Sequence, residues 1–424
     1  MKVIIENIRS FAGRHDIPVY PLTLLVGENS SGKSTFLAAL SAVSDRSSFP
    51  GAASLNKDPY DLGGFDTIAT YKGGKAGRAK KFGLGYSVND QDPTVSAFAV
   101  YAPHHGETKL CSFTLRTPEG NLKLEWVEGR LRGVLSGLPD HVDITLDREL
   151  PEPTPLLSQS LPVILFQSLP KETREMPAAN GLVDRIFSMA QRLSKSLPLT
   201  ASISPVRSTP KRTYDLISEE YDPGGDHIPF VLAKILEETN QTKSQQALLN
   251  AMNEFGRDSG LFEKLIAKRL GSKAGSPFQI NVKTAGPSFN LRDVGYGVSQ
   301  SLPIIVQSVL KSTAPRLLLQ QPEVHLHPRA QAAMGSFFSS LVSTKTKEFV
   351  IETHSDYLID RVRQNVAGGL ISADDVLILF FHKPHIETKV SPLRLDASGN
   401  IQGAPRFYRE FFLQEEMNLF NRVS

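Results

Sequence analysis

The residues best suited to chemistry in this sequence form the run Gly27-Glu28-Asn29-Ser30-Ser31-Gly32-Lys33-Ser34. It fits the pattern of a phosphate-binding loop, in which glycines let several backbone amides converge on a phosphate chain. Lys33 would place a cation on the β- and γ-phosphates, and the hydroxyl of Ser34 is a magnesium ligand in such loops. We therefore expect ATP and Mg²⁺ to bind here. The residues expected to contact them are Gly27, Asn29, Ser30, Ser31, Gly32, Lys33, Ser34 and Thr35.

The flanking segments supply the elements that such a loop needs. Residues 22–26, Leu-Thr-Leu-Leu-Val, have the pattern of a short strand, which leads directly into the glycine loop. Residues 34–43 contain no Gly or Pro and have a helical pattern, and a helix N-terminus adds a positive dipole end for an anion. The alternative is a chance glycine-serine turn before a helix. Strand, loop and helix in this order favour the phosphate-binding interpretation.

A second glycine-rich segment, residues 293–303, precedes an apolar helix at 304–310. Glycines followed by Ser and Gln, with Pro303 in the first turn of the helix, are typical of another helix N-terminus that can receive an anion. Gly297 and Ser299 are the candidate contacts. The alternative is an ordinary turn that caps a buried helix.

A buried apolar strand ends at Gln320 and Gln321, and Glu323 follows two residues later. NTPases place the Walker B group, which faces the metal, at the end of such a strand beside the phosphate-binding loop. His325 and His327 would share one face of a strand, but the sequence offers no evident third ligand, so we do not expect them to bind a metal.

A third apolar strand, within residues 349–352, runs into Thr353, His354 and Ser355. A single histidine is more often structural than functional. At the end of the next strand after the Walker B strand, however, His354 suits a sensor of the γ-phosphate.

The order of segments along the chain predicts an α/β fold. Residues 1–81 and 277–424 carry the motifs, with a strand also expected at 2–7, and they would together form a P-loop NTPase head with mixed sheets. Between them we expect a β-rich lobe over 82–160, followed by a mainly helical insertion over 161–276. The expected strands of the lobe are 95–100, 109–115 and 122–127, and the expected helices are 181–193, 230–238, 244–255 and 261–270.

Composition narrows the class of protein. The 424 residues are 40% hydrophobic and 21% charged, which is ordinary for a globular protein, and no apolar run approaches the roughly 20 residues of a membrane span. One cysteine, Cys111, excludes an intrachain disulfide framework. The N-terminus alternates apolar and charged residues too early for a secretory signal, so we expect a cytoplasmic protein without a membrane partner.

The net charge of +3 is too small to predict nucleic-acid binding by itself. Two local basic clusters leave DNA or RNA binding open, although solvated surface is the simpler interpretation. The clusters are Lys72, Lys75, Arg78, Lys80 and Lys81, and Lys264, Lys268, Arg269 and Lys273, the latter expected to share part of a helix face.

The phosphate-binding loop, the glycine-serine signature, the Walker B strand and the histidine strand, in this order, resemble the ABC-type ATPase heads of the structural-maintenance-of-chromosomes (SMC) class. The resemblance is to the overcoming-lysogenization-defect group and related stand-alone bacterial ATPases, several of which belong to anti-phage defence systems. Residues 204–207 and 211–214 resemble the internal arginine motif of that group, and residues 404–412 resemble its ending.

The resemblance implies a head-to-head homodimer with two ATP molecules between the subunits. Lys33 and Ser34 of one subunit would hold the nucleotide, Gly297 and Ser299 of the other would contact its γ-phosphate, and His354 would be the switch residue. It also implies a departure in this sequence, because Gln320 and Gln321 stand where such heads carry the Walker B acid and the catalytic glutamate.

Glutamine can orient a water molecule and bond to a metal-bound water, so Gln320 is expected to face the metal together with Ser34. It cannot accept a proton, and loss of a general base typically costs on the order of 10²–10⁴ in rate. Glu323 is the nearest remaining carboxylate. We therefore predict slow ATP hydrolysis, with Lys33, Gln320, Gln321, Glu323 and His354 as the catalytic set.

The leading hypothesis is an ATPase that dimerises on ATP and regulates a separate effector, such as a nuclease or toxin, in anti-phage defence. The alternatives are a DNA-repair or DNA-maintenance head that binds DNA, and an inactive ATP-binding scaffold. The sequence contains no long heptad tract for a coiled-coil arm and no acidic TOPRIM-like segment after the ATPase motifs, so we expect an effector activity to reside in a partner.

Overall fold

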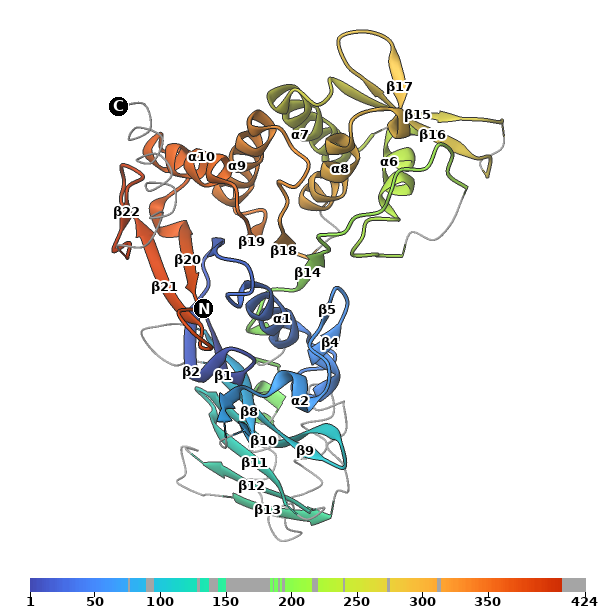
Figure 1. The fold of residues 1–424 in the computed structure, drawn as a ribbon. Helices are drawn as coiled ribbons and strands as arrows, with labels where there is room; N and C mark the ends of the chain where they lie inside the picture. The colour runs from blue at the N-terminus through green and yellow to red at the C-terminus, as the bar shows by residue number, and fades with distance from the viewer. Residues whose placement is uncertain are drawn as a thin grey trace, which may run out of the picture.

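The computed structural model describes residues 1–74, 77–88, 95–127, 130–136, 144–149, 184–185, 187–189, 191–192, 195–215, 220–238, 241–272, 275–310 and 314–405. Two large sheets dominate these residues, with helices packed between and beyond them (Figure 1). No helix in the described ranges is long and apolar enough to cross a membrane.

A seven-stranded mixed sheet carries the phosphate-binding loop. Its order is β14-β18-β19-β3-β20-β21-β22, parallel from β14 to β20 and antiparallel beyond. The five parallel strands are short apolar runs, as expected when helices cover both faces of a sheet. The bounds are β14 Thr200–Ile203, β18 Arg316–Gln320, β19 Glu348–Glu352, β3 Leu22–Gly27, β20 Val376–His382, β21 Lys389–Leu395 and β22 Ile401–Gln402.

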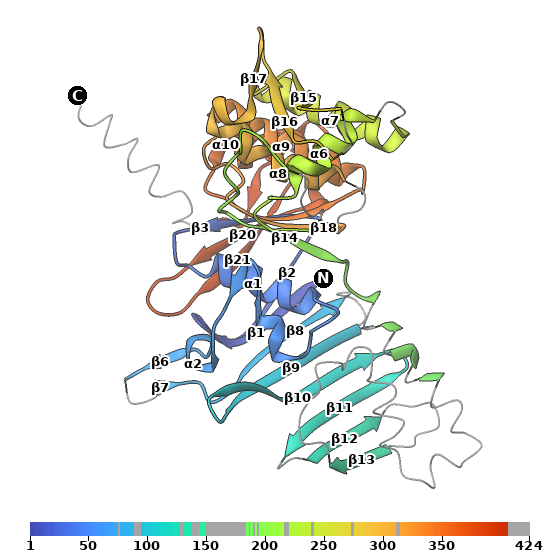
Figure 2. The same ribbon diagram turned by 90° about the vertical axis from the view of Figure 1, so that its right-hand side faces the viewer.

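The side chains of this sheet alternate between two cores, because successive residues of a strand point to opposite faces. Leu25, Leu318 and Val350 belong to a core shared with helix α1 (Lys33–Ser44). Their neighbours along each strand pack instead against helices on the other face. Those helices are α8 Tyr296–Val309, α9 Pro328–Ser343 and α10 Asp356–Ala367. Figure 2 shows the sheet between α1 on one side and these helices on the other.

The second sheet has eight antiparallel strands in the order β13-β12-β11-β10-β9-β8-β1-β2. It forms the far wall of the core that contains α1, and strands such as β9 alternate buried and half-buried residues. The bounds are β1 Lys2–Ile8, β2 Phe11–Pro18, β8 Phe82–Val88, β9 Val95–His104, β10 Glu107–Thr117, β11 Gly120–Val127, β12 Arg130–Ser136 and β13 Ile144–Glu149. Strands β8 to β13 lie within the segment expected to be β-rich, and the N-terminal strands β1 and β2 belong to the same sheet.

Small elements connect α1 to the eight-stranded sheet. They are η1 Ala52–Leu55, β4 Asn56–Lys57, β5 Tyr60–Asp61, α2 Phe65–Ile68, β6 Tyr71–Gly73 and β7 Gly77–Arg78. The turns η3 Leu291–Asp293 and η4 Ala373–Asp375 precede α8 and β20.

The insertion contains the helices expected at 230–238 and 244–255, which are confirmed as α6 (Ile228–Glu237) and α7 (Lys243–Ser259). The helix expected at 261–270 is wrong. That segment forms β15 (Lys264–Arg269), which pairs with β16 (Phe278–Lys283) and, through it, with β17 (Ser288–Asn290). Gly260, at φ 73°, ends α7 in the left-handed conformation, and the chain then leaves the helix axis. Within the helix expected at 181–193, the described residues 184–185, 187–189 and 191–192 are helical, as predicted. The tail at 404–412 lies largely outside the described residues.

The α/β P-loop fold with mixed sheets is thus as predicted. Within residues 1–26, strand β2 was not expected. The sequence predicted strands only at 2–7 and 22–26, whereas β2 lies between them and includes the charged residues Arg14, His15 and Asp16. These side chains are tolerated because β2 is the outer strand of its sheet, where one flank has no neighbouring strand.

Candidate functional site

The loop between β3 and α1 requires glycine at both of its ends. Gly27 has φ 136°, and a Cβ atom there would lie 2.1 Å from the carbonyl oxygen of Phe381. Gly32 has φ 107° and occupies the N-cap position of α1. Because residues with a side chain rarely adopt these conformations, the backbone of the loop requires the two glycines of the predicted motif. The loop therefore places the N-terminus of α1 directly after β3, as a phosphate site needs.

The side chain of Lys33 folds back over the loop and is only 3% exposed. Its Nζ atom donates hydrogen bonds to the carbonyl oxygens of Gly27 (2.9 Å) and Glu28 (2.7 Å). Burial lowers the pKa of Lys33, and the negative charges of Glu352 and Glu28 oppose that effect. The ammonium group is thus held at the mouth of the loop, where it can meet a phosphate oxygen.

Ser34 contacts a carboxylate that the sequence analysis did not select. Its Oγ atom donates to Oε2 of Glu352 at 2.9 Å, and Oε1 of the same carboxylate lies 3.9 Å from Nζ of Lys33. Glu352 is the last residue of β19 and is 7% exposed. The available signal was an apolar strand ending in a carboxylate immediately before Thr353 and His354. The prediction for this strand end was based on His354 and gave Glu352 no role.

A cavity of about 550 Å³ lies over these groups. Three basic side chains line it in addition to loop residues and Glu352. Arg9 comes from the turn between β1 and β2, Arg78 from β7, and Lys383 from the segment between β20 and β21. Tyr71 is also in the lining, and the guanidinium of Arg78 lies 5.8 Å from the centre of its ring. Arg78 was predicted as part of a basic cluster that left nucleic-acid binding open, and the structure places it in the lining of the cavity that contains Lys33 and Ser34, called the nucleotide cavity below. Lys75 of that cluster lies outside the described residues.

The end of β18 is built differently. Gln320 is 9% exposed and is the parallel-register partner of Glu352. Gln321 has φ 44°, and its backbone N–H donates to the carbonyl oxygen of Glu352 at 2.7 Å. Nη2 of Arg207 donates to the carbonyl oxygens of Gln320 and Gln321, both at 3.2 Å. The backbone of the glutamine pair is therefore fixed by neighbours on two sides.

Arg207, in the segment that resembles an arginine motif, is 4% exposed. Burial lowers its pKa to about 10, and the charge of Glu323 opposes this effect. In the second half of the motif, the guanidinium of Arg212 binds both carboxylate oxygens of Asp293, immediately before the signature helix, at 2.8 and 2.6 Å. Arg207 thus braces the end of β18, and Arg212 braces the turn before α8.

Glu323 supports the histidine strand rather than the phosphate loop. Its Oε1 atom accepts the backbone N–H of His354 at 2.7 Å, whereas Oε2 has no hydrogen-bond partner among the described residues. Burial raises the pKa of Glu323, and its hydrogen bonds and Arg207 oppose the shift. His354 is an exposed residue, but the protein around it removes part of the water from its ring. This desolvation and the charge of Lys33 lower the pKa of His354, and Glu352 opposes the shift. The catalytic roles of both residues stay predictions.

The two histidines after the glutamine pair have structural contacts. The ring of His325 packs edge-on against Tyr296, with centroids 5.3 Å apart. His327 caps α9, because its Nδ1 accepts the backbone N–H of Arg329 at 3.3 Å.

The signature helix α8 begins at Tyr296, which is 47% exposed, whereas Gly297 and Ser299 are buried. A Cβ atom on Gly297 would lie 3.0 Å from the carbonyl oxygen of His325, so glycine permits close packing here. Oγ of Ser299 donates to the carbonyl oxygen of Tyr296 at 2.9 Å. Neither Gly297 nor Ser299 is among the described residues that line the nucleotide cavity of their own chain.

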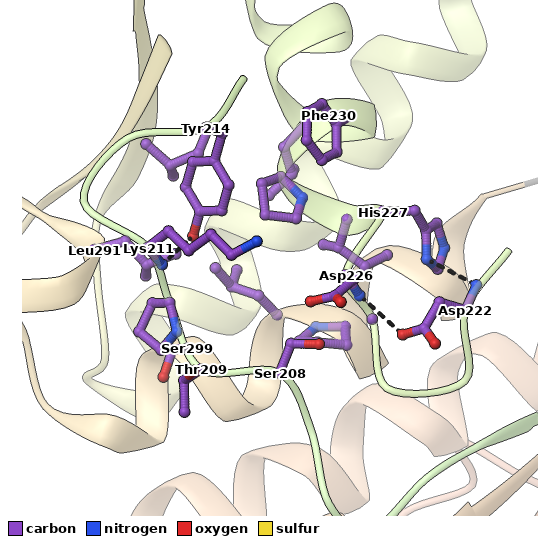
Figure 3. A pocket seen from close by; sticks show the side chains of 18 of the residues that line it. Ser208, Thr209, Lys211, Tyr214, Asp222, Asp226, His227, Phe230, Leu291 and Ser299 are labelled. Atoms are coloured by element: carbon purple, nitrogen blue, oxygen red, sulfur yellow. Dashed lines mark hydrogen bonds between the residues drawn. The ribbon is translucent and has the colours of Figure 1, made fainter. Parts of the chain in front are cut away.

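Ser299 instead borders a separate cavity of about 290 Å³ that is lined in part by α8 (Figure 3). Its walls include Lys211 and Tyr214 on one side and Asp222 and Asp226 on the other. The backbone N–H of Asp226 donates to the Asp222 carboxylate at 3.0 Å, and the Tyr214 hydroxyl accepts the Lys211 N–H at 3.0 Å. Each of these hydrogen bonds joins two residues of the same wall.

Comparison with protein families finds two matches. Residues 174–359 match the family described as AAA ATPase domain, and residues 2–58 match a family described as AAA domain. The first match covers the Arg207 segment, the signature, β18 and β19, and the second covers the phosphate-binding loop. Comparison with curated proteins finds no match. The two family matches and the loop geometry support a nucleotide-binding ATPase.

Among solved structures, the chain is similar to an SMC head bound to the C-winged helix domain of ScpA, with TM-score 0.47, 14% identity, and coverage of 93% of this chain and 97% of that one. It is also similar to a Pyrococcus furiosus SMC head with an extended coiled coil, bound to the C-terminal domain of ScpA (TM-score 0.42, 11% identity, coverage 100% and 98%). A third is the Thermotoga maritima SMC head domain (TM-score 0.36, 10% identity, coverage 92% and 97%).

Proposed function

We propose that this protein is a slowly hydrolysing ATPase that holds Mg²⁺-ATP at the β3–α1 loop and dimerises in its ATP-bound state. The observation that carries the proposal is the assembly of Lys33, Ser34 and Glu352 in one cavity with three further basic side chains. The cavity concentrates positive charge beside a helix N-terminus, which is the electrostatic requirement of a polyphosphate site.

The donors at the loop fit a hard cation. Ser34 offers a hydroxyl, which is exposed at the cavity, and Glu352 offers a carboxylate oxygen 2.9 Å from it. Mg²⁺ prefers such oxygen ligands and usually binds through one or two protein groups together with phosphate oxygens and waters. When bound, Mg²⁺ neutralises charge on the phosphates. The protein orients these oxygens and keeps the Lys33 ammonium beside them.

Slow hydrolysis follows from the groups at the end of β18. Gln320 and Gln321 can donate and accept hydrogen bonds, but neither amide accepts a proton from an attacking water. Glu323 is directed to the backbone of His354, so its carboxylate stabilises the histidine strand. Nucleotide binding and the proton-transfer step therefore depend on different strands of one sheet.

Dimerisation explains the signature segment. Gly297 and Ser299 lie off their own chain's nucleotide cavity, while Gly295 and Tyr296 expose the N-terminus of α8 to solvent. That exposed end can receive the γ-phosphate of ATP held by a second copy, with Gly297 allowing close approach and Ser299 bracing the first turn. His354 of the subunit that holds this ATP would then sense the same γ-phosphate.

The experiment is light scattering on the full chain with and without Mg²⁺-ATP. We expect the mass to double with ATP in the native protein and to stay monomeric in Lys33→Ala, which loses the phosphate cation. In Tyr296→Glu the added negative charge should prevent dimerisation while ATP affinity stays within about threefold of native. Phe289→Glu, at an equally exposed aromatic on β17, is the matched control and should still dimerise. A native protein that stays monomeric at saturating ATP contradicts the proposal.

We propose further that the ATP-bound dimer controls a separate effector, such as a nuclease or toxin, in anti-phage defence and in the cytoplasm. This step rests on the resemblance to stand-alone defence ATPases. An effector-free ATPase that binds DNA is the second candidate, favoured by the exposed Lys72, Lys80 and Lys81. Replacing these three lysines by Ser distinguishes the two, since a DNA-binding head would lose salt-dependent DNA affinity.

A further inference from the structure

We propose that Glu352, from β19, supplies the metal-facing carboxylate that the end of β18 lacks. The acid is thus exchanged from β18 to the neighbouring strand β19. The inference rests on the proposed Mg²⁺-ATP site and assigns its protein carboxylate. Gln320 then serves as the neutral partner of Glu352, instead of being the metal-facing group expected from the sequence.

The sheet geometry puts both side chains on the same side. Gln320 and Glu352 are register partners in a parallel ladder, and each lies two residues beyond a member of the α1-facing core, Leu318 and Val350. Because side chains two residues apart share a face, both point towards α1 and the phosphate loop.

Distance favours β19 over β18. β19 pairs directly with β3, the strand that leads into the loop, whereas β18 is one strand further away. Neighbouring strands are about 4.8 Å apart. A glutamate on β19 therefore reaches Ser34 directly, as the 2.9 Å contact records, and no side-chain contact joins Gln320 to Ser34 among the hydrogen bonds of the described residues.

The charged side chains that line the nucleotide cavity also favour Glu352. Glu352 is the single carboxylate among the described residues that line the nucleotide cavity, beside Arg9, Lys33, Arg78 and Lys383. A second carboxylate at position 320 would stand directly opposite Glu352 in the ladder, and like charges so placed are destabilising. A neutral amide at 320 and an acid at 352 are thus complementary, and the site keeps one negative charge for the cation.

The exchange separates two tasks. Glu352 is turned to Ser34 and holds the cation side of the site, while position 321 still carries an amide and provides no general base. Tight metal-nucleotide binding with slow hydrolysis is the expected combination.

The test is a double-mutant cycle on Glu352→Gln and Gln320→Glu in the full chain, with Mn²⁺ as a paramagnetic stand-in for Mg²⁺. Electron paramagnetic resonance measures Mn²⁺ affinity in the presence of ATP. We expect Glu352→Gln to lose about tenfold in Mn²⁺ affinity, while metal-free ATP binding is unchanged or stronger. Gln320→Glu should gain little in the native background but recover about tenfold in the Glu352→Gln background, because the acid is then returned to β18.

Equal gains from Gln320→Glu in both backgrounds, or a Glu352→Gln variant with native Mn²⁺ affinity, would overturn the inference. If Glu352→Gln fails to fold, Glu352→Asp retains the charge and withdraws it from Ser34 by one methylene; an expected loss of about threefold supports the inference, and no loss overturns it. Ser34→Ala reports on the proposed function separately. A native protein that binds ATP without any dependence on divalent cation overturns the Mg²⁺-ATP site itself, whatever Glu352 does.

Discussion

The ends of two neighbouring strands, β19 and β18, differ in what they offer a nucleotide. β19 ends in Glu352, whose carboxylate contacts Ser34 and lies 3.9 Å from the Lys33 ammonium. β18 ends in two neutral amides, Gln320 and Gln321, whose backbone is held by Arg207 and by the main chain of β19. One strand end is thus equipped to bind a charged ligand, and the other to keep a fixed shape without charge. The contrast suggests that binding and hydrolysis can be changed independently in this molecule.

The largest expected effect concerns the shape of the β18 end. Replacing Arg207 by Leu removes two charge-assisted hydrogen bonds, one buried and one part-buried, and a positive charge that interacts with Glu323, so we expect about 3 kcal/mol of lost stability. The midpoint of urea unfolding measures it. Arg207→Lys keeps the charge and should lose less. A leucine variant within about 0.5 kcal/mol of native would show that the β18 end does not depend on this brace.

The next effect concerns the missing base. Gln321→Glu restores a proton acceptor beside the β18 end, and we expect the single-turnover rate of ATP hydrolysis to rise by about 100-fold. Gln320→Glu adds the same charge one residue earlier and serves as the matched control, with an expected rate close to native. If the two variants accelerate hydrolysis equally, added charge rather than a base explains the gain, and the contrast between the strand ends weakens.

The smallest effect is a pH dependence. Burial raises the pKa of Glu323 above its ordinary value of 4.5. The folded protein therefore binds more protons than the unfolded chain between the two pKa values, and this residue's contribution to the free energy of unfolding falls as pH rises through that window. Glu323→Gln should remove the decline, so the variant should gain stability relative to native between pH 4.5 and neutrality. Urea unfolding at several pH values measures the difference; a constant difference across that range would show that Glu323 ionises as it does in the unfolded chain.

Local patterns predicted much of this molecule. The loop from Gly27 to Ser34 and the helix after it depend on residues close in sequence, and the structure places them as expected. The apolar strands that end at Gln320 and Glu352 were found for the same reason. The helix expected at 261–270 was wrong because pairing with β16, a non-local contact, outweighed the helical pattern.

The site residues that the sequence did not reveal are those that only the fold brings together. Glu352 is 318 residues from Ser34 in sequence, and their contact depends on the strand order β18-β19-β3. The sequence predicted Arg78 as a member of a basic cluster, whereas the hairpin β6–β7 places it at the nucleotide cavity. Parallel register also explains why Gln320 and Glu352 form a pair, which no local spacing could indicate.

A single-turnover experiment tests the separation of binding from hydrolysis most directly. Protein in excess is mixed with labelled ATP and Mg²⁺, and both the bound nucleotide and the released phosphate are followed with time. Typical ATPases turn over at roughly 1–10³ per second, and loss of a general base lowers such rates by about 10²–10⁴. We predict that ATP binds fully and then persists for minutes, with Lys33→Ala failing at the binding step. Hydrolysis at several per second in the native protein would contradict the account.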